Sequence, residues 1–178
     1  MTTTATPNNG FGQLTEPATL TLHRLLPGPI DRVWDYLTQR DLRRQWLADG
    51  EIGTSAGAPM ELIWRNDELT DPPGQKPPGF GEEHRMQSHV TVFEPPHRLA
   101  FGWGDTGDVL FELSLEGDQV LLKLTHSRLP NRNTTLMVGA GWHAHLDLLV
   151  ARVSGLEPAP FWDSWSALRQ AYDARLPA

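Results

Sequence analysis

The amino-acid sequence predicts an α+β fold in which a curved antiparallel β-sheet wraps around one long helix. Two observations support this prediction. Residues 133–155 are the longest stretch that can be read as a single helix, and most of the chain from residue 99 to that point alternates between apolar and polar side chains, as strands do. A long apolar helix that follows a run of antiparallel strands is expected to cover the concave face of their sheet.

The helix expected over 133–155 gathers apolar side chains on one side. Taken at about 100° per residue, one arc contains Gly139, Trp142, Leu146, Leu149, Val150 and Val153. Further apolar residues fall on the opposite side, so we expect little of this helix to face solvent. Asn133 or Thr134 can cap its start, and Gly155 is well placed to end it.

The bulk properties indicate one domain. At 178 residues the chain is long enough to bury a substantial core. Residues 1–16 are rich in Thr, Asn, Gly and Pro and are expected to form a flexible N-terminal tail. Residues 17–178 then form a single domain, in which 158–176 is a C-terminal extension with one further helix.

The first half of the domain begins with a strand over 18–26. A short helix follows from Ile30, where apolar residues recur at positions i, i+3, i+4 and i+7. A second short helix carries Trp46 and stops near Gly50. The sequence therefore predicts two short helices after the first strand.

An antiparallel meander occupies the middle of the chain. Alternating patterns predict strands over 60–65, 84–94, 99–103, 109–115 and 120–126, the last two joined by a Gly117-Asp118 hairpin. The Pro-rich segment 66–81 is long for a loop inside a domain. It is either a lid over the mouth of the sheet or a flexible insertion.

Charge and composition exclude several classes of protein. The net charge is −7 and no block of Lys or Arg occurs, so we expect no nucleic-acid partner. The chain has no cysteine, which suits a reducing cytoplasm, and its start has neither the basic nor the apolar part of a signal peptide. No apolar stretch approaches the roughly 20 residues of a membrane span. We therefore expect a cytoplasmic protein.

This order of elements is that of the helix-grip fold, and four stretches carry a family resemblance. They are IDRVWDYLTQRDLRRQWL, FEPPHRLAFGW, VLFELSLEGDQVLLKLTHSRLP and GWHAHLDLL. The first resembles the paired-helix segment of the SRPBCC (START and birch-pollen-allergen-like) superfamily. The other three resemble the branch named after the activator of the heat-shock protein 90 ATPase. The resemblance covers about residues 18–155 and implies a cavity between the sheet and the long helix.

Seven tryptophans are many for this length, and such aromatic residues fill a core or line a pocket. The residues that we expect at a ligand pocket come from the long helix, the second short helix and the strands. They are Trp46, Trp64, His89, Trp103, His126, Trp142, His143 and Leu146.

Other chemistry has little support in the sequence. His143 and His145 are two residues apart on a helix, so their side chains point about 200° apart and cannot share one metal ion. We expect no metal site and no cofactor, because no phosphate-binding or nucleophile motif precedes the right elements. His143 and Asp147 are four residues apart and form a helix-surface pair, in preference to a catalytic dyad.

Three functions follow from these features. The first is binding of a small hydrophobic or aromatic molecule in the cavity between sheet and helix. The second is a cavity enzyme of the cyclase, dehydratase or hydrolase type, with His143 or His126 as acid or base. The third is co-chaperone-like protein binding in a stress response, implied by the family name alone. Aromatic residues near the C-terminus could pack on their own domain or on the second subunit of a homodimer, and they are Phe161, Trp162 and Trp165.

Overall fold

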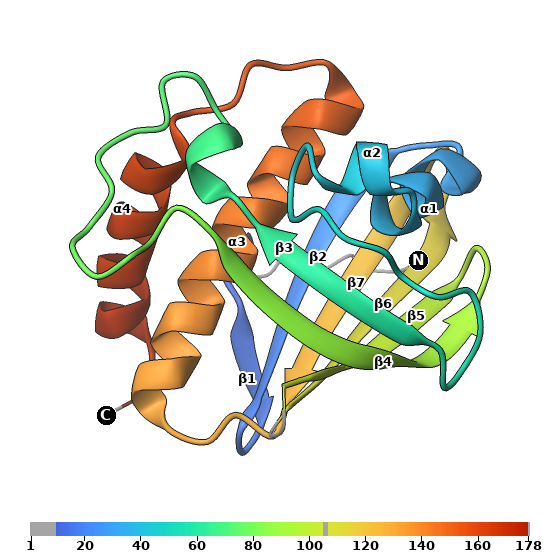
Figure 1. The fold of residues 1–178 in the computed structure, drawn as a ribbon, viewed down its shortest axis with the longest axis horizontal. Helices are drawn as coiled ribbons and strands as arrows, with labels where there is room; N and C mark the ends of the chain where they lie inside the picture. Colours follow the sequence, from blue (N-terminus) through green and yellow to red (C-terminus); the bar gives the residue numbers. More distant parts are fainter. Residues whose placement is uncertain (1–9, 105–106, 178) are drawn as a thin grey trace.

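The computed structural model describes residues 10–104 and 107–177 and contains a seven-stranded antiparallel sheet in the order β1-β2-β7-β6-β5-β4-β3 (Figure 1). The strands are β1 (Gln13–Glu16), β2 (Thr19–Pro27), β3 (Pro59–Trp64), β4 (His84–Glu94), β5 (Arg98–Trp103), β6 (Gly107–Glu116) and β7 (Gln119–Ser127). The helices are α1 (Ile30–Thr38), α2 (Arg40–Arg43), α3 (Arg132–Ser154) and α4 (Phe161–Arg175), with a 3₁₀ turn η2 (Asn66–Glu68). The predicted helix-grip arrangement is confirmed.

The long helix α3 crosses the concave face of the curved sheet (Figure 1). Leu146 and Leu149 are fully buried there against a core that includes Leu122 and Leu124 of β7. The other side of α3 is covered as well, since Phe161 packs on a histidine ring of α3. These contacts explain why the helix has apolar residues all round.

The ends of α3 test the two predicted caps. Gly155 ends the helix in the left-handed conformation with φ 69°, as predicted. The predicted N-cap is wrong, because Asn131 caps the helix: its side chain accepts a hydrogen bond from the Thr134 amide at 2.8 Å.

The meander matches its predicted strands closely. β4 has the predicted bounds, and Pro95-Pro96 after it turns the chain toward β5. In the β6–β7 ladder Glu112 lies opposite Lys123, as expected for strands joined by the Gly117 hairpin.

Two parts of the chain differ from their predictions. Residues Gln13–Glu16, within the expected tail, form the edge strand β1 paired with β2, while residues 1–9 of that tail lie outside the described part of the chain. Trp46 lies in the turns that follow the short helix α2, where its backbone amide donates to the Arg43 carbonyl three residues back, at 3.2 Å. Its indole N–H donates to the Tyr36 carbonyl in the core at 2.8 Å.

Candidate functional site

A cavity of about 420 Å³ opens where the first half of α3 meets the start of β4 and the end of the Pro-rich loop. This volume falls in the range of roughly 300–1,000 Å³ that is typical of small-molecule sites. The wall is mostly apolar, and α3 supplies Met137, Val138, Gly141 and Trp142 to it. The centre of the domain, by contrast, is filled by packed side chains such as Trp46 and Phe111.

One wall of the cavity is a cluster of aromatic rings on the sheet side. Trp103 of β5 contacts both Trp64 of β3 and Trp142 of α3, with ring centroids 5.5 Å apart in each pair. His84 lies opposite Trp64 in the β3–β4 ladder, and the centroids of their two rings are 5.5 Å apart. The alternation of the strands places these rings on the concave face.

The opposite wall comes from the loop and α4. Phe80 packs on Trp162 and Trp165, with centroid distances of 4.8 and 5.0 Å. The loop that carries Phe80 is attached to α4, since the Trp162 indole N–H donates to Asp67 at 2.8 Å and the Phe161 amide to the Thr70 hydroxyl at 2.9 Å. The aromatic residues at the start of α4 are therefore buried within their own chain.

His145 is the most buried polar side chain on the cavity wall, at 5% exposure. Its Nδ1 lies 2.8 Å from the Trp46 carbonyl oxygen, which can only accept, so Nδ1 carries the proton. Burial lowers the pKa of His145 to about 4, so the ring is neutral at neutral pH and Nε2 is an unprotonated acceptor. Nε2 makes no hydrogen bond to any residue of the described chain.

His126 lies behind the cavity wall and does not line it. Its Nδ1 accepts a hydrogen bond from the Trp142 indole N–H at 3.1 Å, which fixes the orientation of that ring. Burial lowers the pKa of His126 to about 4. The position supports Trp142 and keeps the imidazole away from a ligand.

The structure thus brings three of the eight expected pocket residues onto the cavity wall, namely Trp64, Trp103 and Trp142. Trp46 and Leu146 are fully buried in the core, and His89 is exposed on β4, outside this cavity. His145, which the sequence analysis considered only as a poor metal ligand, lines the cavity instead of His143. Among residues 10–104 and 107–177 no group of three or more acidic or histidine side chains is arranged to hold a metal ion.

His143 belongs to a second, buried cluster beside α4. Its Nδ1 lies 3.0 Å from the Tyr172 hydroxyl and its Nε2 3.4 Å from Asp147 Oδ2. Arg24 donates to the other carboxylate oxygen of Asp147 at 3.1 Å. The expected pair of His143 and Asp147 is therefore present, with the Asp147 side chain 54% exposed, but the prediction that both residues lie on the helix surface is wrong for His143, which is only 5% exposed. Burial and the nearby positive charge of Arg24 lower the pKa of His143 to about 3.

The Tyr172 hydroxyl also anchors the segment that precedes β1. It accepts a hydrogen bond from the Gly12 amide at 2.7 Å, and Phe11 packs edge-on against the rings of His143 and Tyr172. Because the hydroxyl accepts from Gly12, its own proton is free to donate to His143 Nδ1. This cluster ties four parts of the chain together and lies outside the cavity.

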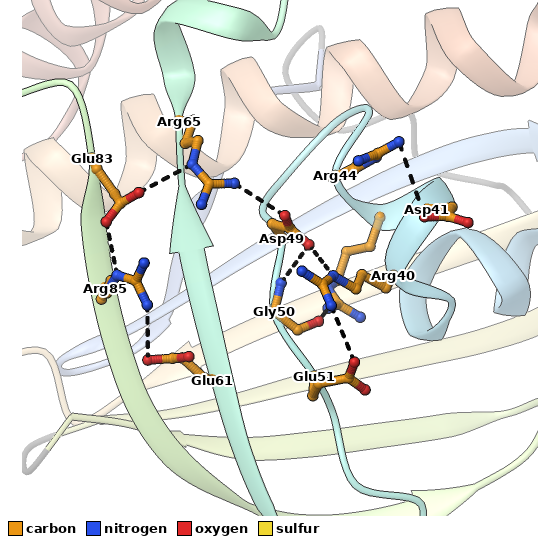
Figure 2. A network of polar contacts seen from close by, with 11 residues as sticks. Arg40, Asp41, Arg44, Asp49, Gly50, Glu51, Glu61, Arg65, Glu83 and Arg85 are labelled. Atoms are coloured by element: carbon orange, nitrogen blue, oxygen red, sulfur yellow. Dashed lines mark hydrogen bonds and ion pairs between the residues drawn. The ribbon is translucent and has the colours of Figure 1, made fainter.

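A network of ion pairs links the segment around Asp49 to Arg65, which follows β3, and to Glu83, which precedes β4 (Figure 2). At its centre is Asp49, whose carboxylate accepts from Arg40 at 2.5 Å, from Arg65 at 3.0 Å and from the Gly50 amide at 2.8 Å. Arg65 also pairs with Glu83 on the cavity rim at 3.1 Å. The hydrogen bond from Arg40 makes the largest contribution to holding the pKa of Asp49 far below its usual range.

Arg43, 1% exposed, lies beneath this network. It donates to the Thr38 and Gly50 carbonyls, and its Nε has no partner within the described residues. Burial lowers the pKa of Arg43 to about 10, so the side chain stays charged at neutral pH. The nearby carboxylate of Asp49 offsets that buried charge.

Replacing Asp49 by asparagine is expected to lower the free energy of unfolding by about 1.5 kcal/mol, because the hydrogen bonds to both arginines lose their charged acceptor. Asp41→Asn is the matched control, since the Asp41 side chain is 86% exposed and lies 4.0 Å from Arg44. Urea unfolding of both variants at neutral pH measures the difference. Equal midpoints would show that the network adds nothing to stability.

Comparison with known proteins supports this fold and its family. Residues 27–154 match the family described as "Activator of Hsp90 ATPase homolog 1-like protein". The protein encoded by gene BPP1335 of Bordetella parapertussis, solved by NMR, is 38% identical, with 95% of this chain and 92% of that chain covered and a TM-score of 0.78. No curated protein matches the sequence.

Two more distant structures agree in fold alone. CalU16 from Micromonospora echinospora is 22% identical, with coverage of 92% and 93% and a TM-score of 0.63. The AHSA1-like protein from Aeromonas hydrophila is 16% identical, with coverage of 78% and 95% and a TM-score of 0.60. None of the helices in the described residues is long and apolar enough to cross a membrane. The chain belongs to the family of activator of Hsp90 ATPase homolog 1-like proteins.

Proposed function

We propose that this protein binds a small hydrophobic or aromatic molecule in the cavity between the sheet and α3. The observation that carries the proposal is the cavity of about 420 Å³, whose walls hold four tryptophans and Phe80. A dry cavity of about 150 Å³ already accommodates benzene, so this one has room for a ligand with more than one ring. Aromatic walls favour such ligands through apolar contact and ring stacking.

Gly141 offers a direct test, because it lines the cavity from the middle of α3. A Cβ added there would approach only Trp165 Nε1, at the ordinary van der Waals distance of 4.0 Å, so the position accepts a side chain on the cavity wall. Gly141→Leu is expected to occupy the cavity and weaken the binding of naphthalene about tenfold. Two-dimensional NMR titration, followed at the amides of α3, measures that affinity.

Gly141→Ala is the matched control for this experiment. It adds only a methyl group to the wall and removes a helical glycine, so we expect little change in affinity and a gain in stability of about 0.5–1 kcal/mol. Both substitutions raise the helix propensity at this position. Weaker binding by Gly141→Leu alone would therefore come from a blocked cavity and not from unfolding of the helix. If Gly141→Leu bound naphthalene as well as the unchanged protein, the ligand would not occupy this cavity and the proposal would be wrong.

A further inference from the structure

We infer that the cavity selects neutral aromatic ligands that carry a hydrogen-bond donor, such as a hydroxyl or ring N–H. His145 Nε2 accepts the hydrogen bond from this group of the ligand. The inference rests on the proposed function and specifies the chemistry of its ligand. It follows from the hydrogen bonds of the cavity wall and from the charges around its mouth.

The hydrogen bond between His145 and Trp46 determines what the ring can offer to a ligand. The Nδ1–H group donates to the carbonyl of Trp46, so a neutral ring presents Nε2 as a lone-pair acceptor only. His145 is 5% exposed and lines the cavity, while its Nε2 has no partner in the described chain. An acceptor in a mostly apolar wall is satisfied best by a ligand that donates.

A second unpaired acceptor lies at the same cavity. Asn66, at the start of η2, lines the wall, and its Oδ1 is buried without a hydrogen-bond partner among the described residues. Unpaired acceptors on two separate elements, α3 and η2, therefore border the cavity and favour a donor-bearing ligand over a purely apolar one.

The charges at the cavity disfavour an anionic ligand. Among the described residues the wall contains no lysine or arginine, and its carboxylates are those of Glu82 and Glu83 at the rim. Glu83 is compensated by Arg65 and Arg85, whereas Glu82 makes no ion pair within the described residues. A carboxylate in the cavity would lose its hydration without gaining a lysine or arginine partner.

Three ligands of one ring system test the inference on the unchanged protein at neutral pH. 2-Naphthol donates a hydrogen bond, 2-methoxynaphthalene has the oxygen without the donor, and 2-naphthoate is an anion. We expect 2-naphthol to bind about tenfold more tightly than the methyl ether and the anion to bind most weakly. Isothermal titration calorimetry gives the three affinities.

A variant then locates the acceptor. His145→Phe keeps a flat ring at the wall but removes Nε2, so 2-naphthol and its methyl ether should bind equally. His89→Phe is the control, because His89 is exposed on β4 and away from this cavity. Should His145→Phe fail to fold, long-range ¹H–¹⁵N NMR of the unchanged protein gives the same answer: addition of 2-naphthol should shift the Nε2 resonance of His145, and the methyl ether should not.

The outcomes separate this inference from the proposed function. If all three ligands and naphthalene fail to bind, both are overturned. If naphthalene, 2-naphthol and the methyl ether bind with equal affinity, the proposed function stands and the selection for a donor is refuted. Tightest binding of 2-naphthoate would likewise overturn the inference, since it would require a cationic partner in the site.

Discussion

Acidification from pH 7 toward pH 5 is expected to reduce the stability of this protein steeply, by roughly 3 kcal/mol per pH unit between about pH 6 and 5. The cause is a set of three histidines buried in neutral form, His126, His143 and His145, each at most 5% exposed. Burial makes the largest contribution to lowering their pKa values, to about 4, 3 and 4, from an ordinary value of 6.5.

The folded and unfolded states bind different numbers of protons, and this difference makes the protein less stable as the pH falls. Below pH 6.5 these histidines take up protons in the unfolded chain but stay neutral in the folded one, so falling pH favours unfolding. Each contributes a slope of up to about 1.4 kcal/mol per pH unit, less near pH 6 where the unfolded histidine is only partly protonated, until the pH reaches its folded pKa. Burial raises the pKa of Asp147, so this carboxyl group binds a proton more readily in the folded protein than in the unfolded chain. In more acidic solution Asp147 therefore stabilises the folded state as the pH falls.

Urea unfolding at closely spaced pH values between 7 and 5 measures this slope. His143→Gln is expected to reduce it by about one third, whatever that substitution does to the stability at pH 7. His89→Gln, at an exposed position, should leave the slope unchanged. A free energy of unfolding that stays flat over this range would show that the three rings gain protons without unfolding.

Replacing Tyr172 by phenylalanine is expected to lower the free energy of unfolding by about 2 kcal/mol. The hydroxyl accepts from the Gly12 amide and donates to His143 Nδ1, so its removal leaves two buried polar groups without their partner. The ring itself stays, and with it the packing on Phe11. The loss is therefore one of hydrogen bonding and not of volume.

The only other tyrosine provides the matched control for this experiment. Tyr36 is 7% exposed, and its hydroxyl makes no hydrogen bond to the described residues. We expect Tyr36→Phe to change stability by less than about 0.5 kcal/mol. Amide hydrogen exchange gives an independent readout, since Gly12 should lose protection in Tyr172→Phe alone. Equal stability of the two variants would refute the anchoring role of Tyr172.

Local sequence patterns predicted most of this fold because strands and helices bury residues at fixed periods. The bounds of β4 were predictable from its alternation and from the Pro95-Pro96 pair that follows it. The early end of α2 was not predictable, because residues 44–47, which form turns in the structure, contain no glycine or proline to mark it. Strand β1 is only four residues long and largely exposed, so its pattern was too weak to read.

The candidate site was less predictable, for a related reason. Trp142 was predictable from its place on the apolar arc of the long helix, whereas alternation alone did not decide which face of the sheet Trp64 and Trp103 occupy. Phe80 and Trp162 reach the cavity from segments far apart in the chain, and no periodicity brings those segments together. His145 was missed because its importance comes from the carbonyl of Trp46, about a hundred residues away.

Strand β2 pairs with β7 from Leu20 opposite His126 to Pro27 opposite Gln119, so the ribosome makes one strand long before its partner. Leu20 and Leu22 are fully buried in the finished domain, but on the nascent chain β2 has only the four-residue strand β1 beside it until β7 has left the exit tunnel. The meander from β3 to β7 joins neighbours in sequence and can pair as it emerges. A stalled chain that stops before residue 119 should therefore expose an apolar strand to chaperones that act during translation.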